Sequence, residues 1–279
     1  EIRLYYEFHD VDIDRYTLGD DYRQVMVSAR EMAQDNLPSQ SQTFVNRRFK
    51  YTHGYGLAMA PVSEFTPGGL PKLLVKNIPP VSEYPALAVE EPRIYYGELT
   101  TGPAVANTSE AEFDYPSGEQ NRYIRYPGDG GVPISSLWRK FVFGWVFDGT
   151  RLLLSSYPHG QSRMMFHRQI RERVETLAPF LEFDADPYVV LVDGRLKWVI
   201  DAYTTSSYYP YSEPFSAGEF IEYRDGAAGQ RLGSRVADSL DGANYVRNAV
   251  KAVVDAFDGT VDLYVFDEDD PIIRTWDRA

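Results

Sequence analysis

Residues 43–65, TFVNRRFKYTHGYGLAMAPVSEF, include the side chains of this chain best suited to chemistry. His53 is followed by Gly-Tyr-Gly. Because glycine permits a positive φ or the close approach of another backbone, this spacing predicts that His53 lies on a tight turn. There it could act as a general base, a metal ligand or a ligand contact. Alternatively, its ring hydrogen-bonds a carbonyl and fixes the turn, since no second histidine lies nearby in the sequence.

Other residues could complete an enzymatic site around His53. Asp114 or Asp129 would orient the histidine as a carboxylate partner. Arg47 or Arg48 would stabilise a developing anion. A hydroxyl nucleophile cannot be assigned, because the chain has no Gly-x-Ser-x-Gly elbow. The catalytic set is therefore incomplete.

A loop rich in tyrosine, near residues 203–214, is the second candidate site. Tyrosine offers rigid, amphipathic contact surface that could stack on sugar rings or peptides. The alternative is that these rings fold back onto the core. The predicted ligand-binding residues, including those near the histidine turn, are Arg47, Arg48, Tyr55, Tyr203, Tyr208, Tyr209 and Tyr211.

Asp10, Asp12 and Asp14 alternate with β-branched residues, so in a strand their carboxylates would share one face. An EF-hand loop needs glycine at its sixth position and glutamate at its twelfth, whereas this segment has Arg15 and Asp21. The pattern favours a solvated strand face, with an irregular cation site as the alternative. The Gly-Asp-Gly-Gly run at 128–131 lacks the Walker lysine and the Rossmann fingerprint, which indicates a turn.

Composition excludes several classes of protein. The 279 residues include 28 basic and 41 acidic side chains, and the net charge of -13 repels nucleic acid and anionic lipid surfaces at long range. No nucleic-acid partner is expected. The chain has no cysteine, which removes disulfides, thiolate catalysis and cysteine-ligated zinc or iron–sulfur sites. No cofactor is predicted. No apolar run is long enough to span a membrane.

Periodicity predicts strands at 2–8, 23–30 and 111–115. Within 43–65 it predicts a short amphipathic helix before the histidine turn and an apolar strand after it. A helix over 134–146 is expected to bury the face that carries Leu137, Phe141, Val142 and Trp145, and a longer helix is expected over 161–181. A polar, glycine-rich excursion is expected over 216–240.

Two Asp-Gly dipeptides between alternating apolar residues predict β-hairpins, 188–192 with 195–203 and 250–257 with 260–266. The predicted fold is α+β, with an antiparallel or mixed sheet that includes both hairpins and with helices packed against it. Residues 1–279 could form one domain, or a loop-rich half at 1–133 and a helix-plus-hairpin half at 134–279.

Several runs carry a family resemblance: 10–16 (DVDIDRY), 51–56 (YTHGYG), 94–98 (IYYGE), 170–174 (IRERV) and 244–259 (NYVRNAVKAVVDAFDG). The chain resembles uncharacterised protein family 0182, which comprises large bacterial and archaeal membrane proteins with several N-terminal transmembrane helices. The resemblance implies a domain on the extracytoplasmic side of the plasma membrane, tethered by helices that are absent here. The start at Glu1 fits a domain cut from a longer protein. No catalytic residue is implied.

Two functions follow from these patterns. The first is a non-enzymatic binding or interaction module whose partners are the transmembrane helices of the same protein, an envelope polymer or another membrane protein. The second is a hydrolase or transferase that acts on cell-envelope substrates with His53 as general base. The incomplete catalytic set favours the module.

Overall fold

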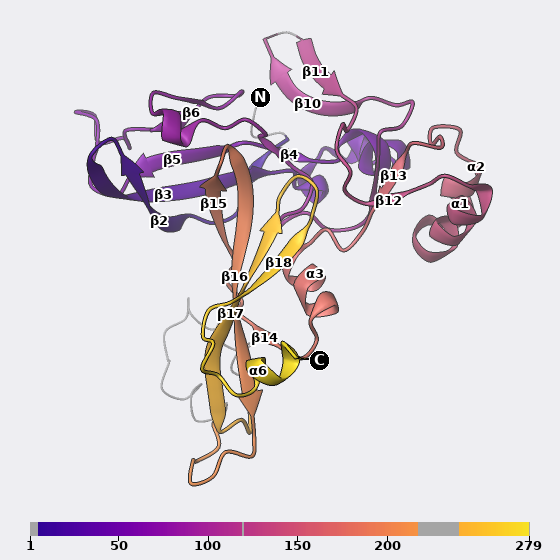
Figure 1. Cartoon of the computed structure of the whole chain (residues 1–279). Coiled ribbons are helices and arrows are strands. Elements are labelled where there is room, and N and C mark those ends of the chain that lie inside the picture. The colour runs from indigo at the N-terminus through magenta and orange to yellow at the C-terminus, as the bar shows by residue number, and fades with distance from the viewer. Residues whose placement is uncertain (1–4, 119, 217–239, 279) are drawn as a thin grey trace. The chain divides into compact units, whose positions relative to one another are not determined.

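The structure, a computed structural model, describes residues 5–118, 120–216 and 240–278 (Figure 1). Most of the predicted excursion at 216–240 and the start of the predicted strand at 2–8 lie outside these residues. The predicted α+β class is confirmed, because antiparallel sheets dominate and the helices are short. The chain forms two compact units: unit 1 comprises Glu1–Ile170, Val189–Lys197 and Asp255–Thr260, and unit 2 comprises Arg171–Tyr188, Trp198–Val254 and Val261–Ala279. The division into 1–133 and 134–279 stays a prediction.

The main sheet of unit 1 is antiparallel, with strand order β1-β3-β5-β6-β7 and with β2 paired to β3. The β2–β3 hairpin closes at Gly19, whose φ of 68° favours glycine. Val25 and Val27 alternate on β3 and are fully buried, so one face of this strand forms core. The strands are β1 (Glu7–Phe8), β2 (Asp12–Leu18), β3 (Asp21–Glu31), β5 (Leu57–Pro61), β6 (Val75–Lys76) and β7 (Val81–Ser82).

Smaller ladders complete unit 1: β4 pairs with β8, β10 with β11, and β13 with both β9 and β12. They are β4 (Gly54–Tyr55), β8 (Arg93–Ile94), β9 (Ala104–Ala106), β10 (Glu112–Ser117), β11 (Gln120–Ile124), β12 (Val132–Pro133) and β13 (Arg163–Met165). The helical segments of unit 1 are η2 (Gln34–Asn36), η3 (Ser39–Ser41), η4 (Asn46–Lys50), η5 (Pro85–Leu87), α1 (Leu137–Phe143), η6 (Gly144–Asp148) and α2 (Thr150–Leu154).

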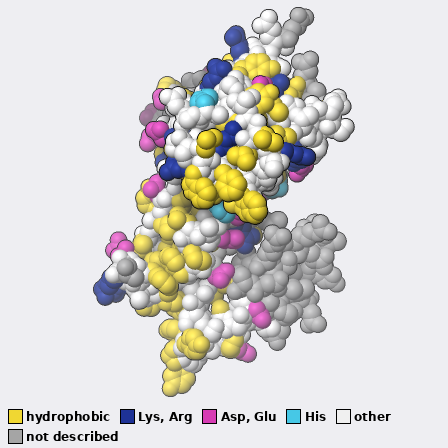
Figure 2. All heavy atoms as spheres, turned by 90° about the vertical axis from the view of Figure 1, so that its right-hand side faces the viewer, with side chains coloured by type: hydrophobic (Ala, Val, Ile, Leu, Met, Phe, Trp, Pro, Cys, Tyr) yellow, Lys and Arg dark blue, Asp and Glu magenta, His cyan; other side chains and the backbone are white. Residues whose placement is uncertain are grey.

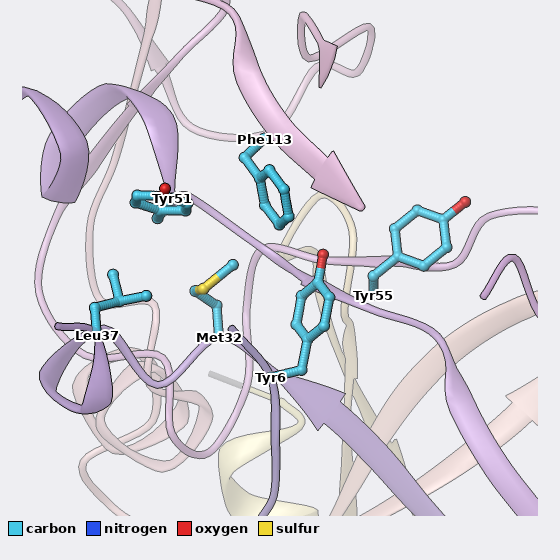
Figure 3. Close-up of a cluster of buried hydrophobic side chains, with 6 residues drawn as sticks. All are labelled: Tyr6, Met32, Leu37, Tyr51, Tyr55 and Phe113. Atoms are coloured by element: carbon cyan, nitrogen blue, oxygen red, sulfur yellow. The ribbon is translucent and has the colours of Figure 1, made fainter. Parts of the chain in front are cut away.

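An aromatic cluster fills the space beside β4 and β10 (Figure 3). Phe113 is at its centre, and the ring centroids of Phe113 and Tyr51 lie 5.5 Å apart. The Tyr6 hydroxyl donates a hydrogen bond to the backbone oxygen of Asp114, so the cluster is joined directly to β10. The buried members are Tyr6, Met32, Leu37, Tyr51, Tyr55 and Phe113.

The helix predicted over 134–146 forms as α1 and η6, but its predicted burial is wrong. The side of Leu137, Phe141, Val142 and Trp145 faces outward, and Leu137 and Trp145 are 82% and 78% exposed. The opposite side meets the core instead: Phe143 and Phe147 pack with a buried cluster that includes Leu152. The segment is apolar on both sides, so periodicity alone could not tell which side faces the core.

The helix predicted over 161–181 is much shorter than expected. Residues 163–165 form β13 and pair with β9 and β12, and His167 adopts a φ of 47°. The α-helix α3 (Ile170–Leu177) therefore begins only after this interruption. Pairing with strands far away in the sequence overrides the local helical pattern.

Both Asp-Gly hairpins are confirmed, and they join one five-stranded sheet as expected, with order β14-β16-β17-β18 and with β15 on β16. Asp193 and Gly194 both have positive φ, as a two-residue type I′ turn requires. The second turn is wider, spanning 256–260, and Gly259 supplies its positive φ. The elements are β14 (Glu182–Phe183), β15 (Tyr188–Val192), β16 (Arg195–Ser206), β17 (Tyr245–Asp255), β18 (Val261–Val265) and α6 (Ile273–Trp276). No helix among the described residues has the length and apolarity needed to cross a membrane.

Gly54 is required by close backbone packing. A Cβ at this position would lie 2.4 Å from the backbone oxygen of Arg30 and 2.7 Å from Cα of Glu31. We expect Gly54→Ala to lower the free energy of unfolding by about 1–3 kcal/mol, because the backbone of β3 must shift to accept the methyl group. Gly160→Ala is the matched control, since nothing lies within 4 Å of its Cβ position. Equal stability of the two variants in urea denaturation would contradict this reading of the histidine turn.

Candidate functional site

His53 immediately precedes β4, and its side chain is fully enclosed, with 0% of its surface exposed. Its ring stacks on Tyr95 with centroids 4.6 Å apart. The Nδ1 atom lies 2.9 Å from Oγ1 of Thr52, and Nε2 lies 3.3 Å from Oδ1 of Asp114. The structure thus brings His53 and Asp114 together.

The hydrogen-bond pattern makes both ring nitrogens of His53 donors. Thr52 has a single hydroxyl hydrogen, which it donates to Oε2 of Glu112 at 2.7 Å, so its oxygen can only accept from Nδ1 of His53. The Nε2 atom faces the Asp114 carboxylate, which accepts hydrogen bonds when ionised. His53 is therefore an imidazolium between two carboxylates, with Oε2 of Glu112 3.7 Å from Nδ1.

Glu112 is fully buried, yet both of its oxygens are satisfied. Oε2 accepts from the Thr52 hydroxyl and from the Tyr95 hydroxyl, each at 2.7 Å. Oε1 accepts from the backbone N–H groups of Asn107 at 2.9 Å and Tyr126 at 3.0 Å. These donors replace the hydration that the ionised carboxylate loses on burial.

Asp114 is positioned by an irregularity in β10. The register between β10 and β11 shifts between Phe113 and Tyr115, so Asp114 is the extra residue of a bulge. The Arg93 guanidinium binds this carboxylate in a bidentate way: Nε donates to Oδ1 at 2.8 Å, and Nη2 donates to Oδ2 at 3.1 Å. Such two-point contacts fix orientation as well as charge.

Arg168 supplies another buried cation. Its Nε donates to the backbone oxygen of Tyr95 at 2.8 Å, and its Nη2 donates to the backbone oxygen of Thr52. Burial lowers the pKa of Arg168 to about 10, so the guanidinium stays charged at neutral pH. We call the following set the charge cluster, with three cations and three carboxylates: His53, Arg93, Arg168, Glu91, Glu112 and Asp114.

The pKa shifts agree with this protonation pattern. Burial by itself would lower the pKa of His53, but the hydrogen bond to Asp114 and the nearby Glu112 outweigh it, and the net pKa is raised. Burial would likewise raise the pKa of both carboxyl groups. Their hydrogen bonds outweigh this effect, so the pKa values of Glu112 and Asp114 are lowered.

This arrangement suits a structural role better than general-base catalysis. A base needs a free lone pair and contact with a substrate, whereas both His53 nitrogens are engaged and the ring has no exposed surface. The sequence did not reveal Glu112, Thr52 or Arg168 as partners. The one available signal was the alternation Glu-Phe-Asp at 112–114, which in a regular strand would place both carboxylates on the side opposite Phe113.

The other predicted catalytic and metal residues lie apart from this cluster. Asp129 is exposed on a loop, and no contact joins it to His53 among the described residues. Within 5–118, 120–216 and 240–278, no three His, Cys, Asp or Glu side chains are placed to hold a metal ion. Asp10, Asp12 and Asp14 therefore form no such group.

The predicted ligand-binding tyrosines occupy different environments. Tyr55 is buried in the aromatic cluster of unit 1. In unit 2, Tyr203 donates its hydroxyl to Asp184 at 2.7 Å. Ligand binding by the loop after β16 stays a prediction, and its exposed rings are those of Tyr208, Tyr209 and Tyr211.

The predicted arginines do share a pocket. Arg47 and Arg48 come from η4, and with Arg151 of α2 they line an open hollow of about 400 Å³. The sequence did not point to Arg151, because it lies about a hundred residues further along the chain.

Comparison with known families identifies the chain. The model of the Uncharacterised protein family (UPF0182) matches residues 1–279. The chain belongs to UPF0182. The resemblance inferred from the sequence runs is thereby confirmed at the level of the family, whose function is not established. No solved structure matches this UPF0182 chain.

Curated UPF0182 relatives are much longer than this chain. It is 47% identical to a UPF0182 protein of Trichodesmium erythraeum over 99% of its own length but 29% of the relative's. It is 46% identical to a UPF0182 protein of Pelotomaculum thermopropionicum, and the match covers 100% of this chain and 28% of the relative. It is 47% identical to one from Methanospirillum hungatei, where the match covers 98% of this chain and 28% of the relative. In those relatives, the region that matches this UPF0182 chain is therefore part of a larger protein.

A structural role predicts a large stability loss on removal of the histidine. We expect His53→Ala to lower the free energy of unfolding by about 3–5 kcal/mol, because it leaves Glu112 and Asp114 without their shared cation. His159→Ala removes an exposed ring and is expected to be nearly neutral. A stable His53→Ala protein would instead favour a functional role for this ring.

The cluster also predicts how stability depends on pH. The raised pKa of His53 means that its contribution is complete below about pH 6.5 and is lost as pH rises through the folded-state pKa. The lowered pKa values of Glu112 and Asp114 mean that their contribution is present above about pH 4.5 and is lost as pH falls. Denaturation curves measured between pH 5 and 9 should show declining stability above about pH 6.5. We expect His53→Gln to remove that decline, and an unchanged slope in this variant would refute the assignment.

Proposed function

We propose that this chain is a non-enzymatic interaction module of a longer membrane-anchored protein, and that it docks on the lipid–water interface on the extracytoplasmic side of the plasma membrane. One observation carries the proposal: a continuous group of exposed apolar side chains on α1 and η6 (Figure 2). We call it the apolar face, and it consists of Leu137, Trp138, Phe141, Val142, Trp145 and Val146.

The apolar face is ordered by its own contacts. The rings of Trp138 and Phe141 stack with centroids 5.7 Å apart, and those of Phe141 and Trp145 stack at 6.3 Å. Isolated exposed apolar residues are ordinary, but a contiguous patch of large side chains indicates an interaction surface. Its residues recur about one helical turn apart, so a flat apolar boundary can meet all of them together.

The chemistry of the apolar face favours a bilayer over a protein groove. Tryptophan is enriched at membrane–water interfaces, where its apolar ring and polar N–H meet the two phases. Arg139 and Lys140 lie between the apolar positions, and no carboxylate occurs from residue 132 to residue 147. Interfacial helices combine these features. The net charge of -13 acts against anionic lipids at long range, but screening confines that field to about 8 Å at physiological salt.

The family relationship supports this reading. The chain spans less than a third of its curated relatives, so most of the larger protein lies outside the structure. An anchor elsewhere in that protein would hold the module near the membrane at high effective concentration, so a modest interfacial affinity suffices. The alternative of a hydrolase or transferase with His53 as base would need a substrate to reach an enclosed ring, and we do not propose it.

Vesicle binding tests the proposal. We expect the chain to co-sediment with vesicles of phosphatidylethanolamine and phosphatidylglycerol, and brominated acyl chains should quench its tryptophan fluorescence. The double variant Trp138→Ser/Trp145→Ser should weaken binding at least about tenfold, since each large apolar side chain contributes about 1.5–3 kcal/mol when fully buried.

The control removes exposed aromatic rings elsewhere. Tyr208→Ser/Tyr211→Ser alters two exposed rings outside the apolar face, so vesicle binding should be unchanged. Both double variants alter surface positions and should keep the melting temperature of the parent chain. Absence of vesicle binding by the parent, or equal binding by the two double variants, would overturn the proposal.

A further inference from the structure

A second surface feature lies beside η6 and carries a different chemistry. The open hollow of about 400 Å³ is within the size range of small-molecule sites. It is built by η2, η4, η6, α2 and the segment around Thr101, all in unit 1. Its lining residues are Gln34, Gln42, Phe44, Arg47, Arg48, Thr101, Gly102, Asp148 and Arg151.

The lining is basic although the whole chain is acidic. It has three guanidinium groups and one carboxylate, in a chain of net charge -13. Arg48 is held in place, since its Nε donates to Oδ1 of Asp148 at 2.8 Å and its Nη1 to the backbone oxygen of Pro103 at 3.0 Å. Arg151 is exposed and makes no hydrogen bond or ion pair with any residue that the structure describes. A cation left free beside a fixed one is suited to bind an oxyanion.

Asp148 provides an independent indication of a ligand. Its side chain is only 6% exposed, and its Oδ2 is buried without a hydrogen-bond partner among the described residues. An unsatisfied buried carboxylate oxygen costs free energy, so a donor from outside the chain would stabilise it. Asp148 lines the hollow, but its Oδ2 has almost no accessible surface, so a hydroxyl group in the hollow reaches this oxygen only when neighbouring side chains shift.

The two glutamines offer hydrogen-bond acceptors to a ligand. The Nε2 of Gln34 donates to the backbone oxygens of Arg47 and Tyr51, at 2.8 and 2.6 Å. The Nε2 of Gln42 donates to the backbone oxygens of Asp35 and Leu37, at 3.0 and 2.8 Å. Both amide groups have thereby used their two N–H donors, which leaves their oxygens as acceptors.

We infer that this hollow binds a phosphate ester of a small polyol, with the phosphate at Arg151 beside the fixed Arg48 and the hydroxyls at the glutamine oxygens and Asp148. The same chemistry occurs in the headgroup of a glycerophospholipid and in a free polyol phosphate. The apolar face plays no part in this inference, so a soluble ligand tests the hollow without any bilayer.

Calorimetric titration with glycerol 1-phosphate and with inorganic phosphate tests the site. We expect glycerol 1-phosphate to bind more tightly than inorganic phosphate, because only the ester carries the alcohol hydroxyls of a polyol, which extend beyond the phosphate toward the glutamine oxygens. Arg151→Gln should weaken its binding about tenfold or more. Arg15→Gln is the matched control, since it removes the same charge from an exposed position on β2 and should leave the affinity unchanged.

Two further arms complete the experiment. Displacement of glycerol 1-phosphate by phosphatidylglycerol vesicles would identify a lipid headgroup as the source, and absence of displacement would identify a soluble polyol phosphate. Trp138→Ser/Trp145→Ser should bind the soluble ester like the parent, which separates this site from membrane docking. If neither probe binds, or if Arg151→Gln and Arg15→Gln bind equally well, the inferred site does not exist.

Discussion

Neutralisation of buried charge is the constraint on which the structure of unit 1 depends. His53 and Glu112 are fully enclosed, and each charge would be costly without a partner of opposite sign. The strands β4, β8 and β10 each contribute to the charge cluster, either directly or through the residue beside them. The bulge at Asp114 and the close approach at Gly54 are the local adjustments that allow these strands to meet around one imidazolium. A change at any of these positions therefore acts on several strands at once.

The same constraint favours a structural role for this histidine between carboxylates. Catalytic carboxylate–histidine pairs leave one ring nitrogen free for the substrate, whereas Thr52 and Asp114 occupy both nitrogens of His53. Glu112 is equally saturated by four donors. Unused bonding capacity is found instead at η6 and α2, where Asp148, with its buried unsatisfied Oδ2, and the exposed Arg151 line the hollow.

Local signals in the sequence predicted the parts of the fold that local physics determines. The Asp-Gly hairpins follow from turn geometry at Gly194 and Gly259, and the strand after the histidine turn follows from an apolar run. The association of His53 with Asp114 was also among the sequence hypotheses, but Glu112 and Arg168 were not, because nothing local links them to residue 53. Long-range pairing of β13 interrupted a predicted helix for the same reason. The pattern at 134–146 predicted a helix correctly, yet its two apolar sides gave no basis for choosing the buried one.

The segment of α1 and η6 packs Phe143 and Phe147 against the core, so its other side is not needed to fill the core. Contact with a bilayer would explain why that other side, the apolar face, is nevertheless apolar. The most direct test of this account is hydrogen–deuterium exchange of the chain with and without phosphatidylethanolamine–phosphatidylglycerol vesicles. The account predicts that vesicles slow exchange of the amides in residues 137–154, while residues 207–212 exchange at the same rate and residues 52–55 and 112–114 stay protected in both conditions. Unchanged exchange at 137–154 in the presence of vesicles would contradict it.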